Sequence, residues 1–191
     1  MFIEPRRSRS KIKGWLEVIC GSMFSGKTEE LIRRLKRAEI AQLKVIIFKP
    51  KIDNRYDETS VVSHDDNKIE SIPIENPKDI IKLSQGLDVV GIDEVQFFSD
   101  DVLEVCNTLA NQGIRVVVAG LDMDFAGIPF HPMPSLMATA EYVTKVHAIC
   151  MGCGDVAQYS NRISEGSQKI LLGEKNDYQA LCRTCFNIAN S

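Results

Sequence analysis

Eight consecutive residues near the N-terminus carry a pattern specific to phosphate chemistry. The segment Gly21-Ser22-Met23-Phe24-Ser25-Gly26-Lys27-Thr28 fits G-x-x-x-x-G-K-[ST] at every fixed position. In such a P-loop the glycines let backbone N–H groups close around phosphates, and the N-terminus of the following helix adds partial positive charge. Lys27 is expected to reach the β- and γ-phosphates, and the Thr28 hydroxyl is expected to ligate Mg²⁺. The segment therefore predicts a site for a nucleotide phosphate chain and magnesium.

Two adjacent carboxylates, Asp93 and Glu94, end the apolar segment 89–92. In the Walker B arrangement, a strand delivers an aspartate to the magnesium beside a P-loop. A glutamate directly after it can accept a proton from the group that attacks the γ-phosphate, either water or a substrate hydroxyl. Asp93 is thus predicted to hold magnesium, and Glu94 to act as a general base.

Four of the six cysteines form two pairs of the C-x₂-C type, Cys150 with Cys153 and Cys182 with Cys185. Each C-x₂-C turn places two thiolates on one side, and two such turns complete a tetrahedron of sulfur atoms around Zn²⁺. The 28 residues between the pairs exceed the usual spacing of about 15–20, which implies a long loop between them. The four cysteines predict a structural zinc site with no open position. The other two cysteines, at 20 and 106, are expected to pack as small apolar side chains.

Short apolar runs alternate with helical patterns along the first 147 residues. Strands are expected at 16–20, 45–48, 89–92 and 114–121, a helix after the P-loop, a short helix at 77–83, and a helix at 100–111 with Ser99 as its N-cap. This alternation predicts an α/β fold with a mostly parallel sheet covered by helices on both faces. Ligands then bind at the carboxyl ends of the strands, where Gly21, Asp93 and Leu121 fall. The polar residues 51–68 are expected to form a loop or flap over the site.

Composition and charge narrow the class of protein. The 191 residues carry a net charge of −3, and 44% of them are hydrophobic, as in an ordinary globular protein. Residues 1–13 have a net charge of +4, which leaves −7 for 14–191, a balance that argues against non-specific nucleic-acid binding. No apolar run is long enough for a membrane span, and the first thirteen residues lack the apolar region of a secretory signal. We expect a cytoplasmic protein with a mobile basic tail (1–13), a P-loop domain (14–147) and a zinc-binding domain (148–191).

Several functions remain open from the residues alone. A nucleoside or small-molecule kinase would use Glu94 on a substrate hydroxyl, whereas an ATPase motor would use it on water. Motors of that kind work between two such domains, and this chain supplies one. A GTP switch lacks its guanine motif, because the nearest segment, Asn67-Lys68-Ile69-Glu70, ends in the wrong residue. A zinc-ribbon module that binds nucleic acid is disfavoured by the acidic charge.

From about Gly14 to Phe186 the chain closely resembles the type II thymidine kinases. Besides the P-loop and the four cysteines, the resemblance is carried by Asp53-Asn54-Arg55-Tyr56, Ser63-His64-Asp65, Asp93-Glu94-Val95-Gln96-Phe97-Phe98, Gly120-Leu121-Asp122, Phe125, Pro129-Phe130, Gly173 and Tyr178. It implies a RecA-like P-loop domain with a small zinc-ribbon or lasso domain. It also implies an ATP:thymidine 5′-phosphotransferase that makes dTMP in pyrimidine salvage, with ATP, Mg²⁺ and structural Zn²⁺.

The resemblance further implies roles for individual residues. Glu94 would be the general base, and Lys27 and Arg55 would neutralise charge on the transferred phosphoryl group. Asp93 and Thr28 would hold magnesium directly or through water, with Asp53 as a further magnesium partner. Gln96 would join the P-loop residues in binding ATP.

A thymine pocket is implied between the two domains. Met23, Leu121, Ser160 and Tyr178 would surround the 5-methyl group, Phe97 and Phe125 would pack on the base, and the backbone of Leu171, Leu172 and Gly173 would bind its polar edge. The zinc would clamp the ends of the loop that carries these last three residues.

Ser160 stands where the family often has threonine. The missing methyl group would loosen discrimination at the thymine methyl, which shifts selectivity without changing the class of substrate. Deoxyuridine is expected as a second substrate. The family resemblance also implies a homotetramer and feedback inhibition by dTTP. From the acidic charge and the lack of a long apolar run, we expect no nucleic-acid or membrane partner.

Overall fold

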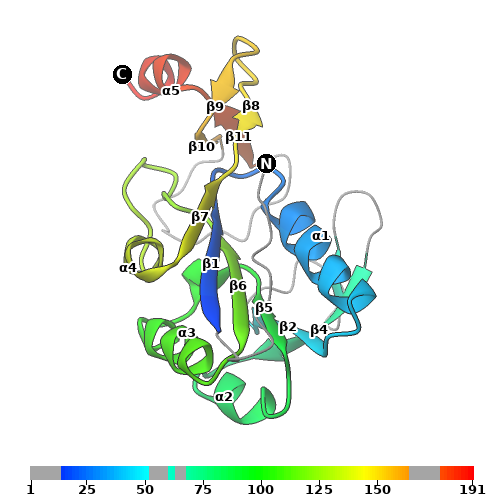
Figure 1. Cartoon of the computed structure of the whole chain (residues 1–191). Helices are drawn as coiled ribbons and strands as arrows, with labels where there is room; N and C mark the ends of the chain where they lie inside the picture. The colour runs from blue at the N-terminus through cyan, green and yellow to red at the C-terminus, as the bar shows by residue number, and fades with distance from the viewer. Residues whose placement is uncertain (1–13, 52–59, 63–67, 164–176) are drawn as a thin grey trace.

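A computed structural model of the chain describes residues 14–51, 60–62, 68–163 and 177–191. Its main sheet has the strand order β3-β4-β2-β5-β6-β1-β7 (Figure 1). The six strands from β4 to β7 in this order are parallel, and β3 (Ser60–Val62) pairs antiparallel with β4. The parallel strands are β1 (Trp15–Cys20), β2 (Val45–Pro50), β4 (Lys68–Ile74), β5 (Val89–Ile92), β6 (Arg115–Gly120) and β7 (Tyr142–Lys145). The predicted mostly parallel α/β sheet is confirmed.

Helices cover both faces of this sheet because successive strand residues point to opposite sides. In β1, Val18 packs into the core cluster that contains residues of α2 (Asp79–Leu83), α3 (Asp101–Asn111) and α4 (Met133–Thr139). Its neighbour Ile19 points to the opposite face, where it packs into a second core cluster that contains residues of α1 (Lys27–Ile40). Among the described residues, none of the helices combines the length and apolar character that crossing a membrane requires.

Two local expectations differ from the structure. Ser99 was predicted to cap the third helix, but α3 begins at Asp101, and its N-cap residue is Asp100, which makes no side-chain capping bond. The Asp100 backbone is helical (φ −57°) and the Val102 N–H donates to the Ser99 carbonyl, so the prediction and the assigned helix start differ by a single residue. The loop prediction for 51–68 is wrong at 60–62 and at 68, which form β3 and the start of β4, because strand pairing outweighs the polar surroundings. Residues 52–59 and 63–67 lie outside the described residues.

The C-terminal part of the chain forms a small unit with its own core. It contains β8 (Ala148–Ile149), β9 (Val156–Ala157), β10 (Tyr159–Arg162), β11 (Tyr178–Leu181) and α5 (Arg183–Ala189). The pairs β8–β9 and β10–β11 are both antiparallel, and the Tyr159 ring stacks on Phe186 with the ring centroids 4.4 Å apart. Figure 1 shows this unit beyond the end of the sheet at which β7 leads into β8.

A buried ionic network attaches α1 to the sheet. Glu17 in β1 accepts hydrogen bonds from Arg34 of α1 (2.8 Å), from Arg115 of β6 (2.7 and 3.3 Å) and from the Trp15 indole (2.6 Å). Arg34 also donates to Thr144 in β7 (2.9 Å). The side chains of Glu17 and Arg34 are both 0% exposed. The network thus ties three neighbouring strands to the helix that follows the P-loop.

We expect Glu17→Ala to destabilise the fold by about 3–5 kcal/mol, because two buried guanidinium groups would lose the carboxylate they share. Urea unfolding followed by circular dichroism measures this change. Lys82→Ala is the matched control, since Lys82 is 82% exposed and its ion pair with Asp79 is 3.7 Å long; its effect should stay within about 1 kcal/mol. Equal midpoints for the two variants would contradict the expectation.

Candidate functional site

The loop between β1 and α1 has the compact form expected of a P-loop. Gly21 has φ +150°, and a Cβ there would lie 2.2 Å from the Val146 carbonyl oxygen; Gly26 has φ +81° at the start of α1. Side chains cannot be accommodated at the first position, and the second favours glycine. The Lys27 ammonium and the Ser25 hydroxyl both donate to the Ser22 carbonyl, at 2.8 and 2.7 Å. The lysine is therefore held over the loop whose backbone N–H groups would face a phosphate.

Thr28 and Asp93 meet, as the two sequence motifs predict. The Thr28 hydroxyl donates to the Asp93 carboxylate at 3.1 Å, and the backbone N–H of Glu94 donates to the other Asp93 oxygen at 2.9 Å. Asp93 is buried. Hydroxyl and carboxylate oxygens are ligands that Mg²⁺ accepts, so this pair could hold the ion beside the P-loop.

Gln96 connects Glu94 to the end of β6. Its amide N–H donates to the Glu94 carboxylate at 2.6 Å, and its amide oxygen accepts from the Leu121 N–H at 3.0 Å. Gln96 is buried, and a Cβ at Gly120 would lie 2.7 Å from its amide oxygen. Glu94 itself has a left-handed backbone (φ +49°), a conformation that is uncommon for residues other than glycine. The amide thus orients the carboxylate; the sequence suggested only a role for Gln96 in ATP binding.

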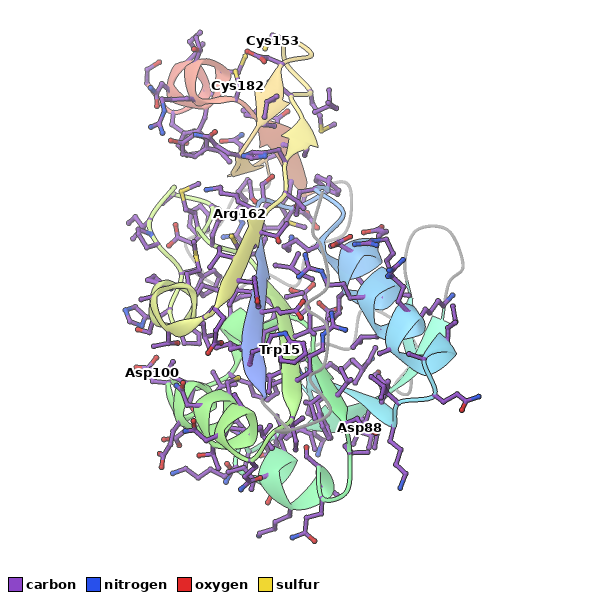
Figure 2. The ribbon with its side chains drawn as sticks, viewed as in Figure 1. Trp15, Asp88, Asp100, Cys153, Arg162 and Cys182 are labelled. Atoms are coloured by element: carbon purple, nitrogen blue, oxygen red, sulfur yellow. The ribbon has the colours of Figure 1, made fainter. Side chains whose placement is uncertain are left out.

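Several residues of the predicted thymine pocket lie at the junction between the sheet and the C-terminal unit. Ser160 accepts a hydrogen bond from the Met23 backbone N–H at 2.9 Å, and the Arg162 guanidinium lies 5.1 Å from the centre of the Phe125 ring. Figure 2 shows Arg162 on the side of the unit nearest the sheet. Tyr178 is buried in β11 and pairs with Arg162.

The remaining predicted site residues either have surroundings other than those above or lie outside the described residues. Phe97 packs edge-to-face on Phe130, with 6.2 Å between ring centroids. Phe24 of the P-loop has a left-handed backbone (φ +63°) and is 37% exposed. Five predicted site residues lie outside the described residues, namely Asp53, Arg55, Leu171, Leu172 and Gly173.

The four paired cysteines form one cluster. Their sulfur atoms all lie within 4.8 Å of one another, and those of Cys153 and Cys182 are 3.7 Å apart. Four thiolates at the usual zinc–sulfur distance of about 2.3 Å stand about 3.8 Å apart, so the cluster fits a tetrahedral zinc ion. Figure 2 shows Cys153 and Cys182 together at the end of the unit far from the sheet.

Hydrogen bonding makes these thiols unequal. Hydrogen bonds from the backbone, that of Cys182 foremost, lower the pKa of the Cys150 thiol to about 6. Hydrogen bonding with the Cys182 side chain raises the pKa of Cys185 to about 12. Because Zn²⁺ binds thiolates, its binding at this cluster would release the protons that remain.

The other two cysteines are buried, as predicted. Burial, with a further contribution from the charge of Asp122, raises the pKa of the Cys20 thiol to about 11. Burial raises the pKa of Cys106 to about 12. Both thiols stay protonated at neutral pH and pack as small apolar groups.

Sequence reasoning missed one ion pair of this region. Asp122, directly after Leu121, lies 2.8 Å from the Lys145 ammonium at the end of β7. The motif Gly120-Leu121-Asp122 drew attention to the aspartate but not to its partner, because nothing in the sequence marks Lys145 as different from a surface lysine.

Comparison with known proteins agrees with this geometry. A family model described as thymidine kinase matches residues 14–186. The chain belongs to the thymidine kinase family. A curated thymidine kinase of Porphyromonas gingivalis is 59% identical over 189 residues, which cover 99% of this chain and 93% of that one. A thymidine kinase of Bacteroides fragilis is 55% identical over 189 residues, covering 99% and 95%.

Likeness to solved structures is distant. A chain described as a DNA replication initiation factor aligns with a TM-score of 0.43 and 14% identity, covering 70% of this chain and 40% of that one. A likeness of this size carries no conclusion about function.

We expect Cys182→Ser to lose bound zinc, because three thiolates and a hydroxyl make a much weaker site than four thiolates. Elemental analysis of the purified protein measures the zinc per chain. Cys106→Ser is the control: this thiol is outside the cluster, and its loss should leave the zinc content unchanged. A full zinc content in Cys182→Ser would show that the cluster is not the zinc site.

Proposed function

We propose that the chain transfers the γ-phosphoryl group of ATP to the 5′-hydroxyl of thymidine, giving dTMP and ADP. The observation that carries this proposal is the carboxylate of Glu94, held by Gln96 one residue beyond the Asp93–Thr28 pair at the edge of the P-loop. A base at this place can serve a hydroxyl that attacks the γ-phosphorus. Family membership supports thymidine as the acceptor and ATP as the donor.

In the proposed reaction the Glu94 carboxylate accepts the proton of the 5′-hydroxyl. At the same time the 5′-oxygen of thymidine forms a bond to the γ-phosphorus. The bond between that phosphorus and the β,γ-bridging oxygen breaks, and ADP leaves with the electron pair. Lys27, together with Arg55, neutralises the charge that develops on the phosphoryl oxygens. Thr28 and Asp93, with Asp53 as a proposed further partner, would hold magnesium, which when bound would withdraw charge from the β- and γ-phosphates. Most of the rate enhancement then comes from positioning and electrostatics.

The thymine base is proposed to bind at the junction between residues 14–147 and 148–191, which we take as the two domains. Met23, Leu121, Ser160 and Tyr178 would surround its methyl group, and Phe97 and Phe125 would contact its faces. The backbone of 171–173 would bind its polar edge, with zinc at Cys150, Cys153, Cys182 and Cys185 holding the ends of that loop. Deoxyuridine as a second substrate, inhibition by dTTP, a homotetramer and a cytoplasmic location belong to the same proposal.

An assay of ADP release with ATP and Mg²⁺ tests this function. It compares four conditions: no acceptor, thymidine, deoxyuridine and single-stranded DNA. The proposal expects turnover with thymidine and weaker turnover with deoxyuridine. Turnover without an acceptor, or turnover stimulated by DNA, would mean that Glu94 serves water and that the chain is an ATPase.

Glu94→Gln should lower kcat by about 10²–10⁴ while thymidine and ATP still bind, because the amide keeps the shape but cannot accept the proton. Steady-state kinetics and equilibrium binding measure the two effects separately. Glu104→Gln, on the exposed side of α3, is the control and should leave kcat unchanged. Near-normal turnover of Glu94→Gln would remove Glu94 from the role of base.

A further inference from the structure

A side-chain hydrogen bond joins the P-loop to the C-terminal unit. The backbone N–H of Met23 donates to the Ser160 hydroxyl at 2.9 Å, across 137 residues of sequence. Ser160 is only 4% exposed. Backbone N–H groups in loops need a partner, and a buried donor that loses its acceptor is costly. The geometry of the P-loop therefore depends on where β10 lies.

The two ends of this bond adjoin two different ligand sites. On one side, Met23 follows Ser22, whose carbonyl holds the Lys27 ammonium. On the other side, Ser160 in β10 pairs with Ala180 in β11, the strand that runs from Tyr178 to the residue before Cys182. A displacement of β11, whether from the nucleoside pocket or from the zinc cluster, is thus transmitted through Ser160 to the loop that carries the phosphate-binding lysine.

The strand β10 also supports the segment that follows β6. Arg162 lies over the Phe125 ring at 5.1 Å, and a Cβ at Gly127 would lie 3.2 Å from the Tyr159 ring. This segment begins at Leu121, whose N–H holds the amide of Gln96. One short strand is therefore in contact with the P-loop and with the chain that orients the Glu94 carboxylate.

We infer that Ser160 is a positioning residue that couples nucleoside binding to ATP binding, an inference that rests on the proposed function because it needs both ligands. A nucleoside held between β11 and Met23 restricts the position of β10 relative to the P-loop. The P-loop needs the same fixed position of β10 in order to hold phosphates. The first ligand to bind therefore loses the conformational entropy of fixing these segments, and the second ligand binds to segments that are already fixed. By thermodynamic linkage, each ligand increases the affinity of the protein for the other by the same factor.

Calorimetric titrations measure this factor directly. Thymidine is titrated into the zinc-loaded full chain with and without a non-hydrolysable ATP analogue and Mg²⁺, and the ratio of the two dissociation constants is compared between variants. In the unaltered protein we expect a ratio of at least about fivefold. Ser160→Ala should bring the ratio close to one, whereas Ser160→Thr, which keeps the hydroxyl, should retain it.

Two further variants separate coupling from folding. Ser84→Ala removes a fully buried hydroxyl that has no hydrogen-bond partner among the described residues. It therefore measures the effect of losing a buried hydroxyl alone, and the ratio of dissociation constants should be unchanged. If Ser160→Ala does not fold, Ser160→Cys replaces the oxygen by a weak acceptor of similar size and should lower the ratio.

The possible outcomes distinguish this inference from the proposed function. If thymidine and the ATP analogue both bind but Ser160→Ala keeps the full ratio, Ser160 is only a structural residue and the inference is wrong. The inference is also wrong if the two thymidine dissociation constants, measured with and without the ATP analogue, are equal in the unaltered protein. If thymidine does not bind the unaltered protein at all, the proposed function fails as well.

Discussion

The parallel pairing of β1 and β5 with β6 between them is the constraint on which the candidate site depends. In register, Cys20 lies beside Gly120, and Ile92 lies beside Val118. All three strands therefore end at one edge, so the P-loop, the carboxylate pair and the segment after β6 start within reach of one another. An antiparallel arrangement would send one of these segments to the opposite edge, and Thr28 could not reach Asp93.

Two buried polar side chains convert this arrangement into a defined geometry. Glu17 fixes α1 to three strands through Arg34, so the helix that continues the P-loop cannot slide across the sheet. Gln96 joins the ends of β5 and β6, and its amide can bind in only one orientation, because Leu121 supplies a donor and Glu94 an acceptor. The first contact positions the phosphate side of the site, and the second positions the base. The hydrogen bond from the Met23 N–H to Ser160 then connects the phosphate side of the site to the C-terminal unit.

The sequence predicted those features whose residues are contiguous or paired at short spacing. The P-loop, the Asp93–Glu94 pair and the cysteine cluster are of this kind, and the structure brings each set together. It did not predict β4 or β7: β4 contains charged residues and Pro73, and β7 lies at the sheet edge with exposed side chains, so neither shows the apolar run of a central strand. The contact between Ser160 and Met23 could not be foreseen, because its donor is a backbone N–H that is the same in every residue. Similarly, a charged residue such as Glu17 inside a strand gives no sign of which distant arginines surround it.

The burial of Cys20 and Cys106 has a practical consequence for handling the protein. With pKa values raised to about 11 and 12, these thiols present almost no thiolate to an alkylating reagent at neutral pH. The thiol whose pKa is lowered, that of Cys150, belongs to the cysteine cluster, so the reactive sulfur of the native chain lies there. Thiol counting before and after treatment with a chelator would read the occupancy of that one cluster, with little background from the rest of the molecule. The number of reactive thiols would thus report how much metal the cluster holds, without an added label.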